Sequence, residues 1–365
     1  MRQAILLAAV VLTVGCGSGS GDDPEPPVPS PKPDTPIPVP EPSESSTPIV
    51  FTALQEEGED VSLARQAAQG GTRATAPLED QIASFKVWGY KEVSASTQIV
   101  FPGYTVTYVN APHSTTTNSD GWEYVRQTPT EQTLKYWDWD VTAYRFFGVA
   151  PATATMTETD DEENHLKKFS FSVTNEEDTP YYSRLWYSTG VLPDYSSRQF
   201  GKPVQLEFVK PLSKVRFMYL FVSPPEGISM GDQTFKPSNG GKIETGGTVT
   251  VSYPLTGEQK QETITVSATT VIDALTEDYV ENGTKKWYTV LPATGQGTYK
   301  LEVKVNDEDK TVVVPAAYMD WLPGYCYTYV FKIDAVGGVE IGWVDYAVTP
   351  WNTSIPAADH QVYNW

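Results

Sequence analysis

The sequence predicts an all-β protein, with two tandem β-sandwiches behind a long N-terminal segment that has no core. Short runs in which apolar and polar residues alternate recur along the chain, for example over residues 85–90 and 169–173, and this period of two is typical of half-buried strands. The 365 residues include 21 Tyr and 10 Trp but 5 Met, and aromatic residues are enriched in strands. Helical periodicity is weak, with residues 62–69 and 272–279 as the candidates.

The first 15 residues have the pattern of an export signal. Arg2 gives a positive start, and residues 4–14 form an apolar run that is too short to cross a bilayer as a helix. Residues 12–15 resemble a relaxed lipoprotein box, so we expect cleavage before Cys16 and lipidation of its thiol. Asp22 and Asp23 resemble the surface-export signal of Bacteroidetes lipoproteins. The alternative is an ordinary signal peptide that is cleaved nearby.

Residues 16–48 are expected to form a disordered tether. Pro-rich runs such as 24–27 and 36–40 favour polyproline II and have no means of burying a core. At about 3.1 Å per residue, such a tether could hold the folded part on the order of 100 Å from its lipid.

The first sandwich is expected over residues 49–202. It begins with an isolated strand-like run at 49–54, in which Ile49, Phe51 and Ala53 share one face. An acidic, Gly-rich stretch that contains Arg65 and Arg73 follows. Further strands are predicted at residues 85–90, 104–109, 144–149 and 169–173.

The second sandwich is expected over residues 203–365. Its predicted strands are 204–208, 215–219, 248–253, 263–266, 299–305, 310–314, 327–333 and 339–348. The polar residues 306–309 between two of these strands predict a hairpin turn. Many short strands with turn signals between them favour sandwiches over other all-β folds.

Charge and rare residues exclude several classes of function. A formal net charge of −20 argues against binding to nucleic acids or to anionic head groups. The three His residues have no paired Cys or His at ligand spacing, and no Gly-rich loop opens a helix, so we expect no enzyme and no cofactor. Apart from Cys16 the chain has one cysteine, Cys326, whose aromatic neighbours predict a buried thiol.

Two acidic clusters could carry chemistry. In Trp137-Asp138-Trp139-Asp140, carboxylates alternate with aromatic rings, as a glycosidase or a glycan-binding site would use. If this run is a strand, both Asp lie on one face and both Trp on the other, which favours a core face opposite a solvated face. Residues 160–163 are four consecutive acids. We expect a solvated loop there, with a calcium site as the alternative.

Four blocks of sequence carry a resemblance to a known family. They comprise 49–53 with 72–74 and 82–90; 121–124 with 134–139 and 144–151; 204–215; and 321–329 with 349–351. In this order, behind a lipoprotein signal, the chain resembles the fimbrillin family, the pilus subunits of Bacteroidetes, in its fimbrillin-like branch. One departure is Pro211, where the family often has a histidine; we interpret it as a packing variation.

The resemblance implies two transthyretin-like Greek-key β-sandwiches and an assembly mechanism. In the family an arginine-specific protease removes the first strand, and a strand of the next subunit fills the groove that is left. Carried over, Ile49, Phe51 and Ala53 mark the removable strand, and Arg73 or Arg65 the cleavage site. These arginines could instead be ordinary loop residues. Residues 339–365 are the candidate donor, or simply the last strand and a tail.

The function that follows is structural and adhesive. We expect a fimbrillin-like pilus subunit, or an anchor or tip component, held at the outer membrane surface by its lipid. Its partners would be other fimbrillin subunits, and a host or bacterial surface receptor. The alternative is a surface lipoprotein that binds glycans and does not polymerise.

Overall fold

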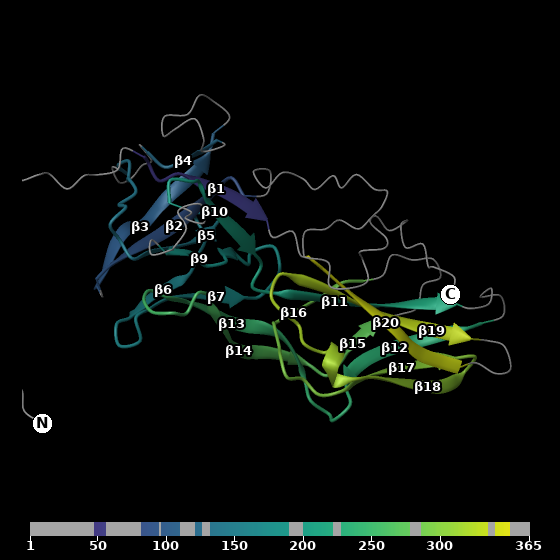
Figure 1. Ribbon diagram of the computed structural model, residues 1–365. Helices are drawn as coiled ribbons and strands as arrows, with labels where there is room; N and C mark the ends of the chain where they lie inside the picture. Colours follow the sequence, from purple (N-terminus) through teal and green to yellow (C-terminus); the bar gives the residue numbers. More distant parts are fainter. Residues whose placement is uncertain are drawn as a thin grey trace, which may run out of the picture. The chain divides into compact units, whose positions relative to one another are not determined.

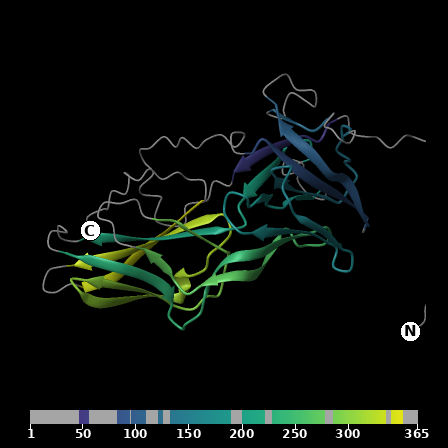
Figure 2. The same ribbon diagram turned by 180° about the vertical axis from the view of Figure 1, so that it is seen from behind.

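The computed structural model describes residues 47–55, 82–94, 96–109, 121–125, 132–189, 200–221, 228–277, 286–334 and 340–350. The chain divides into two units, Met1–Ser43 and Glu44–Trp365, and the described residues belong to the second. They form strands and one short 3-10 turn, Ala316–Tyr318 (Figures 1 and 2), so the all-β prediction is confirmed. No helix in these residues is long and apolar enough to cross a membrane.

The strands fall into four sheets. Their bounds are β1 Phe51–Gln55, β2 Ser84–Val93, β3 Ser96–Tyr108, β4 Trp122–Glu123, β5 Ala143–Ala150, β6 Thr157–Asp161, β7 Leu166–Val173, β8 Tyr181–Ser183, β9 Trp186–Thr189, β10 Val204–Val209, β11 Ser213–Phe221, β12 Met230–Pro237, β13 Ile243–Pro254, β14 Thr263–Ile272, β15 Leu275–Glu277, β16 Tyr288–Val290, β17 Tyr299–Val305, β18 Glu308–Val314, β19 Tyr325–Asp334 and β20 Glu340–Pro350.

The largest sheet has the order β1-β10-β8-β5-β2-β3-β4, with β9 also paired to β5. Both of its faces are covered, and as a result all eight residues of β5 are buried. On one face Phe85 and Phe146 belong to an aromatic core that also includes Phe51 of β1. On the other face Trp88 and Phe147 belong to a second core.

A four-stranded sheet, β14-β13-β7-β6, covers the second face. The ring of Phe147 stacks on that of Tyr253 from β13, with centroids 4.0 Å apart. Trp88 packs on Phe169 from β7 at 4.5 Å. Aromatic pairs of this kind add to the free energy gained by burying their surface, and they join the two sheets face to face.

The C-terminal sandwich consists of the sheets β16-β11-β19-β20 and β15-β12-β17-β18. Phe217, Phe235 and Phe331 lie in the core between them. The predicted hairpin is confirmed, because β17 and β18 pair from Tyr299↔Val314 to Val305↔Glu308 around a turn at Asn306 and Asp307. Both turn residues have positive φ, 50° and 62°, which Asn and Asp tolerate better than most residues.

Two features differ from the sequence-based expectations. A helix over 272–279 is wrong for the described part, because β14 runs to Ile272 and β15 occupies Leu275–Glu277. Leu275 is buried and pairs with Phe235, so the sheet determines its conformation. The acidic run at 160–163 is not wholly a loop, since β6 includes Asp160 and Asp161.

The division at 202/203 and the Greek-key order stay predictions. The first strand after that boundary, β10, pairs with β1 and β8 in the largest sheet. The β13–β14 hairpin likewise joins β7 across the boundary. Any domain limit must therefore accommodate strands that return to the first sandwich from the second half of the chain.

Candidate functional site

The first strand lies between two segments that are distant in the sequence. On one side β1 pairs in parallel with β10, from Phe51↔Val204 to Gln55↔Phe208. On the other side the residues just before β1 bond the segment 135–137. There the amide of Ile49 donates to the carbonyl of Lys135 at 2.8 Å, and the amide of Trp137 donates to the carbonyl of Thr47 at 3.1 Å. Main-chain bonds on both sides fix the register of this segment.

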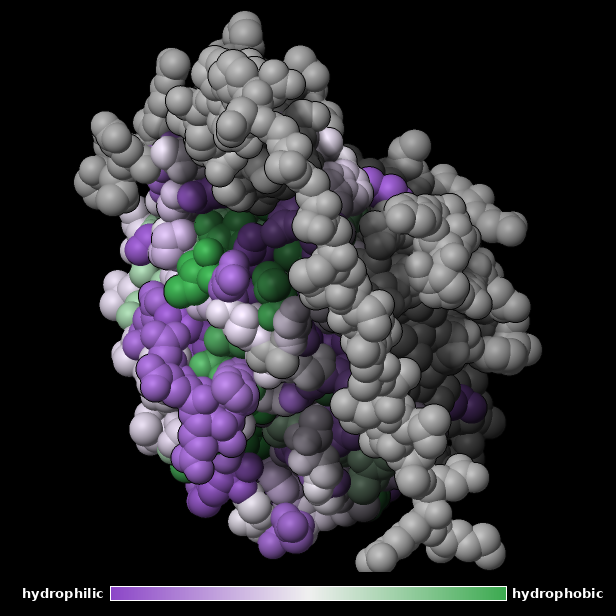
Figure 3. Space-filling model, turned by 60° about the vertical axis from the view of Figure 1, so that its left-hand side comes forward, coloured by the Kyte–Doolittle hydropathy of each residue, from purple (hydrophilic) through white to green (hydrophobic). Residues whose placement is uncertain are grey.

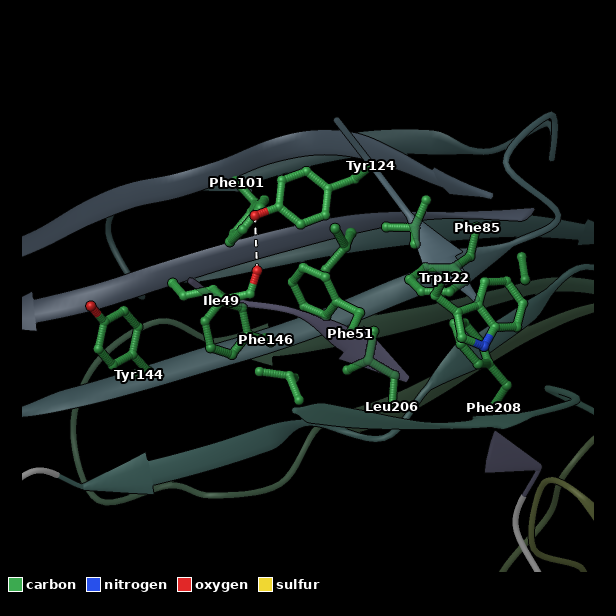
Figure 4. Packing of buried hydrophobic residues seen from close by; sticks show 14 of the residues in the cluster. Ile49, Phe51, Phe85, Phe101, Trp122, Tyr124, Tyr144, Phe146, Leu206 and Phe208 are labelled. Carbon is green, nitrogen blue, oxygen red and sulfur yellow. Dashed lines mark hydrogen bonds between the residues drawn. The ribbon is translucent and has the colours of Figure 1, made fainter. Parts of the chain in front are cut away.

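The side chains of Ile49 and Phe51 belong to the aromatic core. Ile49 and Phe51 are fully buried, and Val50 is 2% exposed. The ring of Phe51 meets Phe101, Phe146 and Tyr124 edge-on, with centroids 5.0, 5.7 and 6.0 Å away (Figure 4). At about 1.5–3 kcal/mol for each large apolar side chain, burying these three residues contributes roughly 5–9 kcal/mol.

A tyrosine locks the main chain of this segment from within the core. The hydroxyl of Tyr124 donates to the carbonyl of Ile49 at 2.8 Å and accepts from the amide of Lys135 at 3.1 Å (Figure 4). Burial raises the pKa of Tyr124 well above its usual value, although the bond from Lys135 opposes this. The side-chain amide of Gln132 bonds the carbonyl of Tyr124 and both main-chain groups of Thr105. The tyrosine is therefore held in place before it bonds Ile49.

These contacts define what we call the first-strand seat: the surface of β10, residues 135–137, Phe101, Tyr124 and Phe146 that encloses residues 49–51. Ala53 is partly buried against the same core as Ile49 and Phe51. The sequence missed the roles of Tyr124 and Gln132. An aromatic block at 121–124 was visible, but nothing local in the sequence indicates that its last ring bonds a carbonyl 75 residues earlier.

The sequence model of the fimbrillin-like family matches residues 72–351. The chain belongs to this family. Membership makes it a fimbrial, adhesin-like protein, and confirms the resemblance expected from the four blocks. A comparison with curated proteins gives no match.

Several solved structures are similar to this fimbrillin-like chain. A candidate cell adhesion protein of Bacteroides uniformis is 17% identical, with a TM-score of 0.36, over 74% of this chain and 92% of that one. One from Parabacteroides distasonis is 10% identical, with a TM-score of 0.39, over 82% and 96%. The tip fimbrial protein Mfa3 of Porphyromonas gingivalis, truncated at its C-terminus, is 11% identical, with a TM-score of 0.30, over 77% and 97%.

Several predicted positions lie outside the described residues. They are the lipidation site Cys16 and the two cleavage candidates, Arg65 and Arg73. Of the candidate donor 339–365, residues 340–350 are described as β20, which pairs antiparallel with β19 from Tyr325↔Pro350 to Asp334↔Glu340. Lipidation, cleavage and donation stay predictions.

The expected arrangement of the Trp-Asp-Trp-Asp run is wrong. The two Trp do not share a face, because Trp137 is fully buried whereas Trp139 is 38% exposed. The run is not a strand: an isolated bridge at Tyr136 precedes it, and residues 139–140 form a turn. Asp138 accepts a hydrogen bond from Lys91 at 2.8 Å. Partial burial would raise the pKa of Asp138, but the bond from Lys91, the bond from the amide of Asp140 and the charge of Lys91 together lower it, which suits an ion pair and not a general acid.

Two acids of the second acidic cluster pair with lysines of the neighbouring strand. Asp160 pairs with Lys167 at 2.8 Å, and Asp161 with Lys168 at 2.6 Å. The bond from Lys168 lowers the pKa of Asp161 to about 2. No group of three or more potential metal ligands occurs in the part of the chain that the structure describes. Asp160 and Asp161 are therefore held by cross-strand ion pairs.

The prediction of a buried thiol is confirmed at Cys326, which is 5% exposed. Burial raises its pKa to about 12, so the thiolate that reacts with oxidants and metals is scarce at neutral pH. Of the three histidines, His165 lies in the turn between β6 and β7, while His113 and His360 are outside the described residues.

Proposed function

We propose that the protein is a subunit, anchor or tip of a surface fimbria, whose uncut form is tethered to the outer membrane by a lipid on Cys16. It assembles by strand exchange at the first-strand seat. An arginine-specific protease cuts after Arg65 or Arg73, the first strand leaves, and a strand of another subunit takes its place. The partners are other fimbrillin subunits, and a surface receptor for the adhesive role.

The observation that carries this proposal is the way residues 49–51 are held. They are buried as deeply as any core strand, yet their contacts with the seat are non-covalent and follow the pattern of a bound peptide. Main-chain bonds give affinity, and pockets for Ile49 and Phe51 give specificity. Any strand with apolar residues at the corresponding positions could bind there.

The order of the chain supports removal by cleavage. Arg65 and Arg73 both lie between β1 and β2, so one cut after either would leave the first strand attached by non-covalent contacts alone. The match with the family begins at residue 72, beside Arg73. We favour Arg73 for this reason.

The donor is proposed to lie beyond Pro350. Because β20 already pairs along the whole of β19, its release would break that sheet edge. Residues 351–365 follow it and retain apolar and aromatic side chains, including Val362, Tyr363 and Trp365. This narrows the donor that the sequence placed at 339–365.

Limited trypsin digestion of the chain from Gly17 onward tests the proposal. We expect one early cut, after Arg73 or Arg65, followed by ladders of oligomers in a sizing assay. The matched controls are Arg65→Ala, Arg73→Ala and the double variant, and the one that blocks cutting should also block the ladders. A protein that is cut there but stays monomeric would contradict a stalk role and favour an anchor or a tip.

Exposed aromatic residues favour the alternative of a glycan-binding protein as the second candidate. Tyr136 and Trp139 are 39% and 38% exposed, and the exposed carboxylate of Asp140 follows them. Rings beside a carboxylate suit stacking on a sugar with a hydrogen bond to its hydroxyls. Binding of soluble polysaccharide by uncut protein, lost in Trp139→Ala and retained in Thr52→Ala, would support this candidate.

A further inference from the structure

The strand β14 is a long sheet edge with one described partner. Nine of its ten residues pair with β13, and no described strand pairs with its other side. In Figure 1 it lies outermost in its sheet, beside β13. From Ser252↔Thr263 to Gly247↔Ala268 the pairing is regular, and the two register shifts lie beyond this point. Six residues therefore present a straight row of main-chain groups on the open side.

This edge lacks the devices that usually block edge-to-edge association. Such devices are charged side chains, prolines and very short strands. Residues 263–272 contain no Asp, Glu, Lys, Arg or Pro, in a chain with 72 charged residues. The opposite edge of the same sheet, β6, carries Glu158, Asp160 and Asp161. Figure 3 shows how hydrophilic and hydrophobic residues are distributed on one face of the molecule. The edge strand β18 of the C-terminal sandwich carries Glu308, Asp309 and Lys310.

The acids nearest to β14 are neutralised within the chain. Glu262, just before the strand, pairs with Arg184 at 3.0 Å, and its side chain is 6% exposed. Asp273, just after it, pairs with Lys242. A second copy of this acidic chain could therefore approach β14 without bringing unpaired carboxylates together.

The two rows of side chains on β14 are compatible with their own copies. Ile264, Val266 and Ala268 pack inward against the core, whereas Thr263, Thr265, Ser267 and Thr269 are exposed on the outer face. A two-fold axis perpendicular to the sheet places outer residues opposite outer residues and inner opposite inner. Hydroxyls would then face hydroxyls and apolar groups would face apolar groups, both of which are favourable cross-strand pairs.

We propose that β14 is a self-association edge, and that its occupant is β14 of a second copy, paired antiparallel around an axis near Thr265 and Val266. The two four-stranded sheets become one continuous sheet. This contact is lateral, uses a different sheet from the first-strand seat, and needs no proteolysis. On a crowded surface it would join neighbouring molecules side by side.

Sedimentation velocity over a range of concentrations, with uncut protein, tests the proposal. We expect a monomer–dimer equilibrium. Thr265→Lys and Thr265→Glu place like charges opposite or diagonally across the axis, so each should weaken the dimer at least about tenfold. An equal mixture of the two variants should recover it, because the introduced ammonium of one copy would then meet the introduced carboxylate of the other. Thr157→Lys and Thr157→Glu on β6 are matched controls and should leave the dimer unchanged.

Three results would overturn the proposal: a protein that stays monomeric at about 1 mM, a mixture that does not recover association, or Thr157 variants that weaken the dimer as much as Thr265 variants do. Unchanged thermal unfolding of the Thr265 variants shows that they are folded. Since no protease is present, the result is independent of strand exchange at the first-strand seat.

Discussion

At the scale of single residues, Phe51 is the central side chain that the first-strand seat encloses. Its ring contacts three other aromatic rings from three different parts of the chain, and it has no exposed surface. Protein interiors are packed closely enough that such a site cannot collapse around a missing ring. The free energy that retains the uncut strand therefore depends strongly on this one side chain.

Replacing Phe51 with Ala should lower the free energy of unfolding by about 3–5 kcal/mol, through lost burial and a residual cavity. Urea titration measures this change, provided that the dependence of the unfolding free energy on urea concentration has the same slope in the variant as in wild type. Thr52→Ala, on the same strand but partly exposed, is the control and should cost less than about 1 kcal/mol. A similar loss in both variants would show that the strand is held by its main chain and not by the pocket.

At the scale of elements, Arg145 connects β5 to the turn after β13. The guanidinium is 1% exposed and donates to the carboxylate of Glu92 at 2.8 Å. It also donates to the carbonyls of Leu255 at 3.2 Å and Gly257 at 2.6 Å. One side chain from the largest sheet thereby satisfies the main chain of its neighbour, a geometry that the planar guanidinium can provide and an ammonium cannot.

We expect Arg145→Met to destabilise the protein by about 3 kcal/mol or more, because Glu92 and two carbonyls would lose their donor. Lys91→Met on the adjacent strand breaks an ion pair with Asp138 whose side chains are 24% and 37% exposed, and should cost at most about 1 kcal/mol. Denaturant titration compares the two variants. Equal losses would mean that burial adds nothing to the Arg145 contact.

Strands with one exposed face were predictable from the sequence, and those determined by distant contacts were not. The alternation over 169–173 and 299–305 corresponds to β7 and β17. In contrast, β15 lies within the candidate helix because Leu275 pairs with Phe235 of a distant strand. The same holds for the site. The apolar face of 49–53 could be predicted from the sequence, whereas its parallel pairing with β10 could not, because the two strands are far apart in the chain and no local pattern indicates that they meet.

At the scale of the whole molecule, one loop joins the two sandwiches. Glu176, in the loop between β7 and β8, pairs with Lys214 of β11 and accepts from the hydroxyl of Thr289 of β16 at 3.2 Å. Lys210, in the connection from β10 to β11, donates to the carbonyls of Glu176 and Thr179. Its ammonium also lies 4.2 Å from the centre of the Tyr181 ring. This arrangement orders the loop at the point where the chain passes from one sandwich to the other.

The buried position of Lys210 predicts an alkaline rise in stability. Burial lowers its pKa from about 10.5 to about 8, so between these values the unfolded chain binds the proton that the folded protein has released. Stability therefore increases with pH in this window, and the contribution of Lys210 is constant below it, where both states are charged. Buried tyrosines act in the opposite sense at higher pH. Their pKa values are raised in the folded protein, so the unfolded chain loses its phenol protons first and stability falls as the pH rises.

The difference in unfolding free energy between wild type and Lys210→Met isolates the contribution of the lysine. From pH 8 to 10 this difference should change by about 2 kcal/mol in favour of wild type. Parallel curves for the two proteins would mean that the carbonyls and the Tyr181 ring keep the ammonium charged throughout.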